Sequence, residues 1–395
     1  MAKGTPISIE ETWQNRAEKS IAQGSLTNSK RSACFPECYP THFASGQSAY
    51  LYTADRTHYV DFICSLGSNL FGHANTLITE AICTQVVKGI NFSLGSELEV
   101  KAAERAKELW PMIERLRFLK TGSEACTAAI RIARAYTGNP TVLSEGYHAW
   151  HDEFVSLTPP ALGVQTQHFI KKLSDFISDD GEFDFEYSYI AAVIVEPVIT
   201  DASPARISWL QKLREACTKH NIVLIFDEII TGFRYPKLSA SGCHNIRPDL
   251  VCFSKAIAGG MPLSIVGGRE EIMNCGEYFV SSTFAGEMLS LAAFIRASEL
   301  VTSGKYEVED LIKRSTWFCD AFNELFPDKL KIEGYGTRGV FVGDDMDKAV
   351  FWQEAVKSNL LFGPSFFTCF GHIPLFDTVL FTIKNIALKI KLGKV

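Results

Sequence analysis

The chain has 395 residues, of which 46% are hydrophobic and 21% are charged, and its formal net charge is -6. This length and apolar content are sufficient for one large domain and a smaller one, each around a buried core. The mildly acidic balance excludes the global basic field that draws proteins to nucleic acid or anionic membranes, so small-molecule chemistry is favoured.

The first residues, "MAKGTPISIEETWQNRAEKS", lack the apolar core of a signal peptide, and no apolar run approaches membrane-spanning length. We therefore expect a cytoplasmic protein without a membrane or nucleic-acid partner. The eleven cysteines are scattered, and the nearest pair, Cys34 and Cys38, has no second pair to complete a zinc site. We interpret the cysteines as small buried hydrophobes and expect no metal.

Three regions follow one another along the chain. Residues 1–75 contain "SAYLYTADRTHYVDFIC", which predicts an antiparallel hairpin, and we expect them to contribute to a small domain. In residues 76–300 strand-like runs alternate with amphipathic helical patterns, which predicts an α/β domain with a mainly parallel sheet. Residues 301–395 mix helices with short strands and end in a basic amphipathic helix, which we expect to close the small domain.

The central region contains six strand-like runs, and in a parallel sheet the ligand lies beyond their carboxyl ends. The runs are "RLRFLKT", "PTVLSEG", "IAAVIVEPV", "IVLIFDE", "DLVCFSK" and "LSIVGG". The first leads into an alanine-rich helix, so Gly122 and Ser123 fall at a helix N-terminus, where free N–H groups favour a phosphate. The alternative is that Ser123 or Thr121 only caps that helix.

The next two strand ends carry aromatic and acidic residues. "YHAWHDEF" places Tyr147 and His148 after a strand, where an aromatic ring could stack on a flat ligand or only cover the sheet edge. Its two histidines alone do not make a metal site, because no other strand end supplies His or Cys. Glu196 ends another strand, either as a carboxylate facing the ligand or as part of a salt bridge that holds the loop.

Two further strand ends carry charged residues at positions that need a partner. Asp227 and Glu228 follow the apolar run "VLIF", where burial of a carboxylate costs several kcal/mol unless a donor or cation pairs with it. Lys255 ends "DLVCFSK" and precedes "AIAGGMP", whose glycines let the backbone pass close to a ligand. A desolvated lysine has a lowered pKa and can form a Schiff base, although a lone lysine more often reaches out to solvent.

These strand ends together match the needs of pyridoxal phosphate: a phosphate cradle, an aromatic ring, a carboxylate and a Schiff-base lysine. Asp227 then pairs with the protonated pyridine nitrogen, and Lys255 holds the aldehyde and later moves protons. A Schiff-base aldolase on a closed barrel also uses a lysine at a strand end. It would explain neither the glycine-serine helix start nor Asp227.

Several motifs resemble those of the class III aminotransferases of pyridoxal-phosphate fold type I. The motifs are "TGSEACTAAIRIARAYTG", "GYHAWHDEF", "VIVEPV", "LIFDEIITGFR", "FSKAIAGGMP" and "SSTFAGEMLSLAA". The resemblance implies a large domain with a mainly parallel seven-stranded sheet and a small α+β domain. It also implies pyridoxal 5'-phosphate as the cofactor and a homodimer with shared active sites.

The resemblance assigns roles to individual residues. It implies that Lys255 is the Schiff-base lysine, Asp227 the partner of the pyridine nitrogen and Glu196 a catalytic carboxylate near the substrate. The implied cofactor ligands are completed by Gly122, Ser123, Tyr147 and Thr283, the last reaching the phosphate of the neighbouring subunit. Ser68 and Asn69 match a region near the substrate, or else only stabilise their loop. Glu287, at the position of a family asparagine, is a further candidate substrate contact. Arg338, in "GTRGV", is a candidate for gripping a carboxylate, or else for a structural salt bridge.

Within this family the chain is similar to glutamate-1-semialdehyde 2,1-aminomutases and to sugar-acid transaminases. Aminomutases usually carry "GNP" where this chain has "GEM", with Glu287 in place of asparagine. We therefore expect a transaminase that moves an amino group from L-glutamate to an aldehyde or ketone. The expected acceptor is a keto-sugar acid of lipopolysaccharide biosynthesis, such as an 8-oxo-3,8-dideoxy-octulosonate. The alternatives are the aminomutase and a catalytically degenerate binding protein of the same fold.

Overall fold

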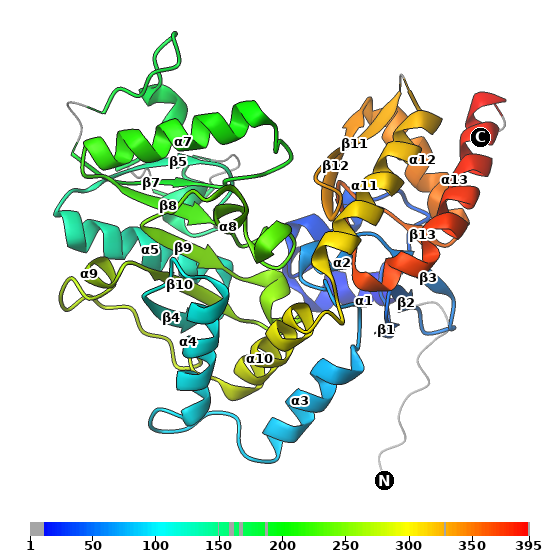
Figure 1. Cartoon of the computed structure of the whole chain (residues 1–395). Coiled ribbons are helices and arrows are strands. Elements are labelled where there is room, and N and C mark those ends of the chain that lie inside the picture. The colour runs from blue at the N-terminus through cyan, green and yellow to red at the C-terminus, as the bar shows by residue number, and fades with distance from the viewer. Residues whose placement is uncertain are drawn as a thin grey trace.

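The computed structural model describes residues 12–148, 150–157, 162–165, 169–185, 189–327 and 329–393 (Figure 1). Its largest sheet has seven strands in the order β4-β10-β9-β8-β7-β5-β6. They are β4 (Arg115–Leu119), β5 (Thr141–Glu145), β6 (Ile170–Lys172), β7 (Ile190–Val195), β8 (Val223–Asp227), β9 (Leu250–Phe253) and β10 (Ser264–Gly268). All six strands expected in this region are confirmed. The seven-stranded sheet that the family resemblance implied is therefore confirmed. The residue pattern did not locate its seventh strand, β6, because only one of the three side chains is apolar.

The sheet is mainly parallel. Strands β6, β5, β7, β8 and β9 pair in parallel, whereas β10 runs antiparallel to both β9 and β4. The link between β9 and β10, residues 254–263, is too short for the crossover that a parallel pair requires. Because β10 is antiparallel to both of its neighbours, β4 points in the same direction as β5, β7, β8 and β9. The carboxyl ends of these five strands therefore lie at one edge of the sheet.

Helices surround this sheet and make up much of the rest of the chain. The α-helices are α1 (Trp13–Ser20), α2 (Cys64–Gly67), α3 (Thr76–Val86), α4 (Glu97–Leu109), α5 (Gly122–Thr137), α6 (Asp152–Val155), α7 (Pro204–Lys219), α8 (Ala240–His244), α9 (Glu270–Met273), α10 (Met288–Thr302), α11 (Val308–Leu325), α12 (Asp345–Lys357) and α13 (Phe376–Lys391). Within the described residues, no helix is both long and apolar enough to cross a bilayer.

The two faces of the sheet belong to different cores. On β8, Leu224 and Phe226 pack in a core that includes residues of α7 and α10, while Val223 and Ile225 pack in a second core with α5. Successive strand residues point to opposite faces. Asp227, the next residue after Phe226, therefore lies on the face that α5 covers.

Two smaller sheets lie on the other side of the molecule, beside α11, α12 and α13 (Figure 1). One contains β1 (Ser45–Gln47), β2 (Tyr50–Tyr52), β3 (His58–Asp61) and β13 (Leu360–Leu361), and the other contains β11 (Leu330–Gly334), β12 (Arg338–Gly343) and β14 (Ser365–Phe367). Strands β2 and β3 form the expected hairpin. Because β13 pairs with β3, the first and last parts of the chain share one sheet. The boundaries at residues 75 and 300 stay a prediction.

The closing helix and the cysteines were also predicted from sequence. Helix α13 packs its apolar face, including the fully buried Ile383, into the core of this smaller part. All eleven cysteines are free thiols, and burial is confirmed for Cys64, Cys126, Cys217, Cys252, Cys319 and Cys369. The prediction of burial is wrong for Cys34, Cys38 and Cys83, which are exposed. Cys34 and Cys38 lie among short 3₁₀ turns, and Cys83 lies on the outer face of α3.

Candidate active site

The first turn of α5 forms an open anion cradle. Thr121 caps this helix: its Oγ1 accepts the N–H of Glu124 at 3.2 Å, and Glu124 Oε2 accepts the N–H of Thr121 at 2.8 Å. The capping alternative is therefore right for Thr121 and wrong for Ser123. The N–H groups of Gly122 and Ser123 precede Ala125, the first intrahelical donor, so the cap leaves them open to a phosphate.

Gly122 also lets two strand ends approach each other. A Cβ atom at this position would lie 2.5 Å from Cδ1 of Ile229, a separation that real Cβ atoms do not tolerate. The N–H of Ile229 in turn donates to Oδ1 of Asp227 at 3.1 Å. The absence of a side chain at Gly122 therefore lets the start of α5 pack against Ile229, the residue whose N–H contacts Asp227. An anion cradle and a buried carboxyl group fit a cofactor with a phosphate and a ring nitrogen.

Asp227 is 5% exposed, and both of its carboxyl oxygens have hydrogen-bond partners. Its Oδ2 lies 2.9 Å from Nδ1 of His148 and 3.4 Å from the Cys126 thiol. The other ring nitrogen of His148 lies 3.0 Å from the Glu145 carbonyl, which can only accept a proton. The His148 ring therefore bridges the Asp227 carboxyl group and the backbone at the end of β5.

Lys255 begins the 3₁₀ helix η6 (Lys255–Ala258) in a left-handed conformation, with φ of 52°. Such a conformation costs a non-glycine residue on the order of 1 kcal/mol, and strain of this kind concentrates at functional sites. Burial lowers the pKa of Lys255, and the charges of Asp227 and Glu196 offset part of that effect. A lowered pKa keeps more of the amine neutral, which is the form that attacks a carbonyl.

Glu196 and Tyr147 meet at the ends of β7 and β5. The Tyr147 N–H donates to Oε1 of Glu196 at 2.9 Å. Burial raises the pKa of Glu196, and the negative charge of Asp227 raises it further. The Tyr147 side chain is 64% exposed, so the ring does not merely cover the sheet edge, and stacking on a ligand stays a prediction.

A salt bridge does hold the loop that follows Glu196, but it joins Arg206 to Glu145 and does not involve the Glu196 side chain. Arg206 donates to both carboxylate oxygens of Glu145 at 2.9 Å each. The same guanidinium donates to the backbone carbonyls of Glu196 at 2.9 Å and Pro197 at 3.1 Å. Arg206 therefore fixes the ends of β5 and β7 relative to each other and leaves the Glu196 carboxylate free to face the site.

Arg338, at the start of β12, lies close enough to Lys255 and Glu196 for its charge to lower the pKa of both. Among the described residues it makes no ion pair: Nη1 donates to the Ile199 carbonyl, and Nε is buried without a partner. A buried guanidinium N–H without an acceptor is costly. The carboxylate-binding alternative for Arg338 is therefore better supported than a structural salt bridge.

The structure places Thr283 and Glu287 on the segment that leads into α10. Thr283 is exposed, and its backbone carbonyl accepts a hydrogen bond from Asn91 at 3.2 Å. Glu287 caps α10 through the N–H of Leu289 at 2.6 Å and forms a buried ion pair with Lys120 at 2.8 Å. These contacts already occupy the Glu287 carboxylate, so its substrate role stays a prediction that must compete with a structural one.

Ser68 and Asn69 lie beside the loop that follows Lys255. Ser68 Oγ donates to the Ser65 carbonyl at 3.0 Å, which is a loop-stabilising contact. Asn69 donates to Nδ1 of His73 at 3.0 Å, and a Cβ atom on Gly260 would lie 2.7 Å from the Asn69 side-chain oxygen. Asn69 is thus close to the lysine loop, while the substrate contacts of both residues stay predictions.

Sequence reasoning missed two partners of the central carboxylate. His148 was noted only as a neighbour of Tyr147, and Cys126 only as one of several cysteines. The signal for His148 was available, since it follows a strand end next to β7 and the carboxyl ends of parallel strands converge. No sequence pattern distinguishes Cys126 from the other small residues of α5, because its contact with Asp227 depends on how the helix packs across the sheet.

Comparisons with known proteins agree with this geometry. Residues 37–357 match the family model described as aminotransferase class-III. The chain is 31% identical over 393 residues to a glutamate-1-semialdehyde 2,1-aminomutase of Wigglesworthia glossinidia brevipalpis, covering 88% of this chain and 89% of that relative. It is 34% identical over 307 residues to the enzyme of that name from Francisella philomiragia, covering 72% and 71% of the two chains.

Solved structures show the same fold. The FumI protein of Sphingopyxis sp. MTA144, in its PLP internal aldimine form, superposes with a TM-score of 0.85 at 23% identity and covers 96% of this chain and 95% of its own. An omega-transaminase from Sphaerobacter thermophilus gives 0.84 at 22% identity, with 95% and 96% covered. The family match, the fold type I architecture and the site together lead to one conclusion: this chain belongs to the class III aminotransferases, enzymes that depend on pyridoxal 5'-phosphate.

Proposed function

We propose that the protein is a two-substrate transaminase whose amino donor carries a carboxylate, with L-glutamate as the donor. The observation that supports this proposal is Arg338, whose Nε is buried without a partner near the Lys255 amine and Glu196. A guanidinium binds a carboxylate through paired hydrogen bonds. Arg338 would hold the donor by that group, with its amine directed toward Lys255.

The residues at the sheet edge divide the chemistry among them. Pyridoxal phosphate, when bound, supplies an electron sink for negative charge on the amine-bearing carbon. The N–H groups of Gly122 and Ser123 would hold its phosphate and Tyr147 its ring, while Asp227 would keep a proton on the pyridine nitrogen. Nζ of Lys255 would take a proton from one carbon and return it to another, as a general acid and base.

The acceptor and the assembly are the finer parts of the proposal. We take the acceptor to be an aldehyde or ketone, with a keto-sugar acid of the 8-oxo-3,8-dideoxy-octulosonate type as the leading candidate and cell-envelope synthesis as its setting. We also propose a homodimer in which Thr283 of one subunit reaches the phosphate held by the other. The exposed position of Thr283 is consistent with such a shared site.

A second candidate is the 2,1-aminomutase activity for which the curated relatives are named. That reaction needs only one substrate, glutamate 1-semialdehyde, which also carries a carboxylate that Arg338 could bind. This chain differs from the usual aminomutase pattern, because Glu287 stands in place of an asparagine. The Glu287 carboxylate pairs with Lys120 and caps the start of α10.

The decisive experiment is the visible spectrum of the holoenzyme before and after addition of L-glutamate alone. A transaminase loses the yellow absorption of its bound cofactor and releases 2-oxoglutarate. An unchanged spectrum with glutamate, together with conversion of glutamate 1-semialdehyde without 2-oxoglutarate, would establish the aminomutase instead. A protein that cannot take up pyridoxal phosphate would support the degenerate binding protein.

The role of Arg338 has a separate test. We expect Arg338→Leu to raise KM for L-glutamate by about 10- to 100-fold, because a hydrogen bond to a charged group is worth roughly 1.5–3 kcal/mol. The cofactor spectrum should remain. Arg314→Leu is the matched control, since Arg314 forms only an exposed pair with Asp310 within α11. An unchanged KM in Arg338→Leu would remove the carboxylate-binding role.

A further inference from the structure

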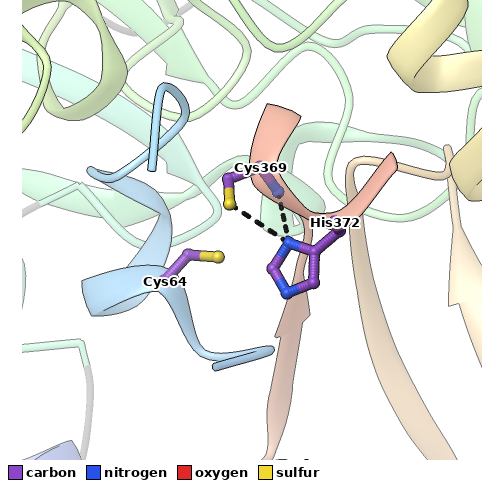
Figure 2. A group of neighbouring side chains, drawn as sticks. All are labelled: Cys64, Cys369 and His372. Atoms are coloured by element: carbon purple, nitrogen blue, oxygen red, sulfur yellow. Dashed lines mark hydrogen bonds between the residues drawn. The ribbon is translucent and has the colours of Figure 1, made fainter. Parts of the chain in front are cut away.

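Cys64, Cys369 and His372 form a buried cluster away from the strand-end residues described above. Figure 2 shows the two sulfur atoms facing each other, Cys64 from α2 and Cys369 from the residue before the 3₁₀ helix η7 (Phe370–Leu375). The two sulfur atoms and a ring nitrogen of His372 all lie within 4.8 Å of one another. Each of the three residues is at most 1% exposed.

We propose that Cys64 and Cys369 are a modification site, a dithiol that hydrogen peroxide converts into one intrachain disulfide. The Cys369 thiolate attacks a peroxide oxygen, hydroxide leaves, and Cys369 becomes a sulfenic acid. The Cys64 thiol then attacks that sulfur, an S–S bond forms, and the sulfenic oxygen leaves as water. Two thiols lose two electrons in total, and one peroxide is reduced to two waters. A small oxidant is required because neither sulfur is exposed.

The contacts of the two sulfurs give them different roles. Cys64 Sγ lies 3.3 Å from the Asp61 carbonyl and 3.5 Å from the Phe367 carbonyl, so it is a protonated donor. Cys369 Sγ lies 3.1 Å from Nδ1 of His372, and Nδ1 also accepts the Cys369 N–H. Since Nδ1 is an acceptor, the Cys369 thiol donates to it, and His372 is the base placed to take the thiol proton. The neighbouring Cys64 thiol and His372 lower the pKa of Cys369. Cys369 is the nucleophile and Cys64 the resolving thiol.

A buried cation next to the pair favours the thiolate. Arg234 is fully buried and forms no ion pair among the described residues. Its guanidinium donates to the carbonyls of Gly67 and Thr368, each at 2.7 Å, and Nη2 has no partner. Its charge acts on both Cys64 and Cys369. A negative sulfur at this place would supply the charge partner that Arg234 otherwise lacks.

The same contacts argue against a metal ion in this cluster. Nδ1 of His372 already accepts the Cys369 N–H at 3.0 Å, so a zinc ion would have to displace that hydrogen bond or bind through Nε2. It would also lie close to the Arg234 guanidinium, which repels a divalent cation. Metal binding is therefore an outcome that the experiment must separate from the disulfide.

Disulfide closure would act on a strained loop next to the active site. Cys64, Ser65 and Leu66 have φ values of 46°, 49° and 57°, and the loop continues to Asn69, beside the glycines that follow Lys255. Since an S–S bond is about 2.05 Å long, closure draws the loop toward η7. We expect this shift to move Asn69 and change turnover.

The test treats the holoenzyme with hydrogen peroxide, blocks free thiols with an alkylating reagent after denaturation, and maps the peptides by mass spectrometry. We expect a Cys64–Cys369 cross-linked peptide with the loss of two hydrogen atoms per chain, reversed by a dithiol reductant. Cys64→Ala and Cys369→Ala must each abolish that peptide. Cys319→Ala is the matched control, because Cys319 is a buried thiol of the same core that is not part of the Cys64, Cys369 and His372 cluster.

Two outcomes would overturn the proposal. One is alkylation of both Cys64 and Cys369 after a peroxide treatment that oxidises the exposed Cys34, Cys38 and Cys83. The other is stoichiometric zinc in the purified protein that Cys64→Ala releases. Because the readout is a covalent bond between named residues, the result is independent of which amino donor or acceptor the enzyme uses.

Discussion

Asp227 and Glu228 are adjacent carboxylates at the end of one strand, yet their surroundings differ completely. Asp227 accepts hydrogen bonds from His148, Cys126 and the N–H of Ile229, and it influences the ionisation of Lys255. Glu228 is completely buried, and its partners come from the segment after the strand and from α8. Alternation along the strand sends one carboxylate to the site and its neighbour into the scaffold.

Glu228 is satisfied entirely by neutral donors. Its oxygens accept the N–H of Ala240 at 2.6 Å, the N–H of Ser241 at 2.9 Å and the hydroxyl of Thr231 at 2.7 Å, and the Ser241 hydroxyl also donates to it. Burial raises the pKa of Glu228, and these donors offset part of the effect. A buried carboxylate at a strand end therefore does not by itself imply a ligand; the identity of its donors decides.

The largest effect is expected from Asp227→Ala. Loss of the carboxylate removes the group that would stabilise a proton on the pyridine nitrogen, and we expect kcat to fall by about 10²- to 10⁴-fold, the range typical of a positioned acid or base. The fold should persist, as judged by far-ultraviolet circular dichroism. Lys255→Ala provides the reference for complete loss of turnover. Retained turnover in Asp227→Ala would contradict the assignment of Asp227 to catalysis and of Glu228 to structural stability.

Glu228→Ala should have the opposite profile. It leaves at least two buried N–H groups without an acceptor, and each such group costs about 1–3 kcal/mol, so we expect a loss of roughly 3 kcal/mol in the free energy of unfolding. Chemical denaturation measures this loss. The folded fraction should still bind pyridoxal phosphate with the wild-type spectrum. Glu228→Gln keeps an acceptor and should lose less, whereas equal loss in both variants would argue that charge matters more than hydrogen bonding.

The smallest effect concerns Glu196, whose folded-state pKa is raised by burial and by Asp227. A raised pKa means that Glu196 contributes stability below its unfolded-state pKa and loses this contribution as the pH rises through the folded-state value. Glu196→Gln removes the ionisation but can still accept the Tyr147 N–H. We expect the variant to gain stability relative to wild type as the pH rises toward neutrality, measured on the apoenzyme. If the difference in stability between Glu196→Gln and wild type did not change with pH, the raised pKa of Glu196 would be contradicted.

The sequence predicted the strands of the large sheet and the charged residues at their ends, because both follow from runs of apolar residues. The strands of the large sheet follow from runs of apolar residues, and the positions of Asp227 and Lys255 follow from where those runs end. The position of the seventh strand could not be predicted, because the strand is short and mostly polar. The roles of Cys126 and Arg206 could not be predicted either, since each depends on contacts between segments far apart in sequence. For Glu287, the family motif suggested a substrate contact, which stays a prediction, whereas the contacts that the structure shows are the cap of α10 and the ion pair with Lys120.

The pairing of β13 with β3 has a consequence for the order of synthesis. The hairpin of β2 and β3 is made well before the strand that covers its open edge, because Leu360–Leu361 follows residues 62–359 in the chain. Until then the edge of β3 presents unpaired N–H and C=O groups that can associate with other chains. We expect newly made protein to depend on protection of this edge during translation, and truncation before residue 360 to yield aggregates even though the residues of the large sheet are complete.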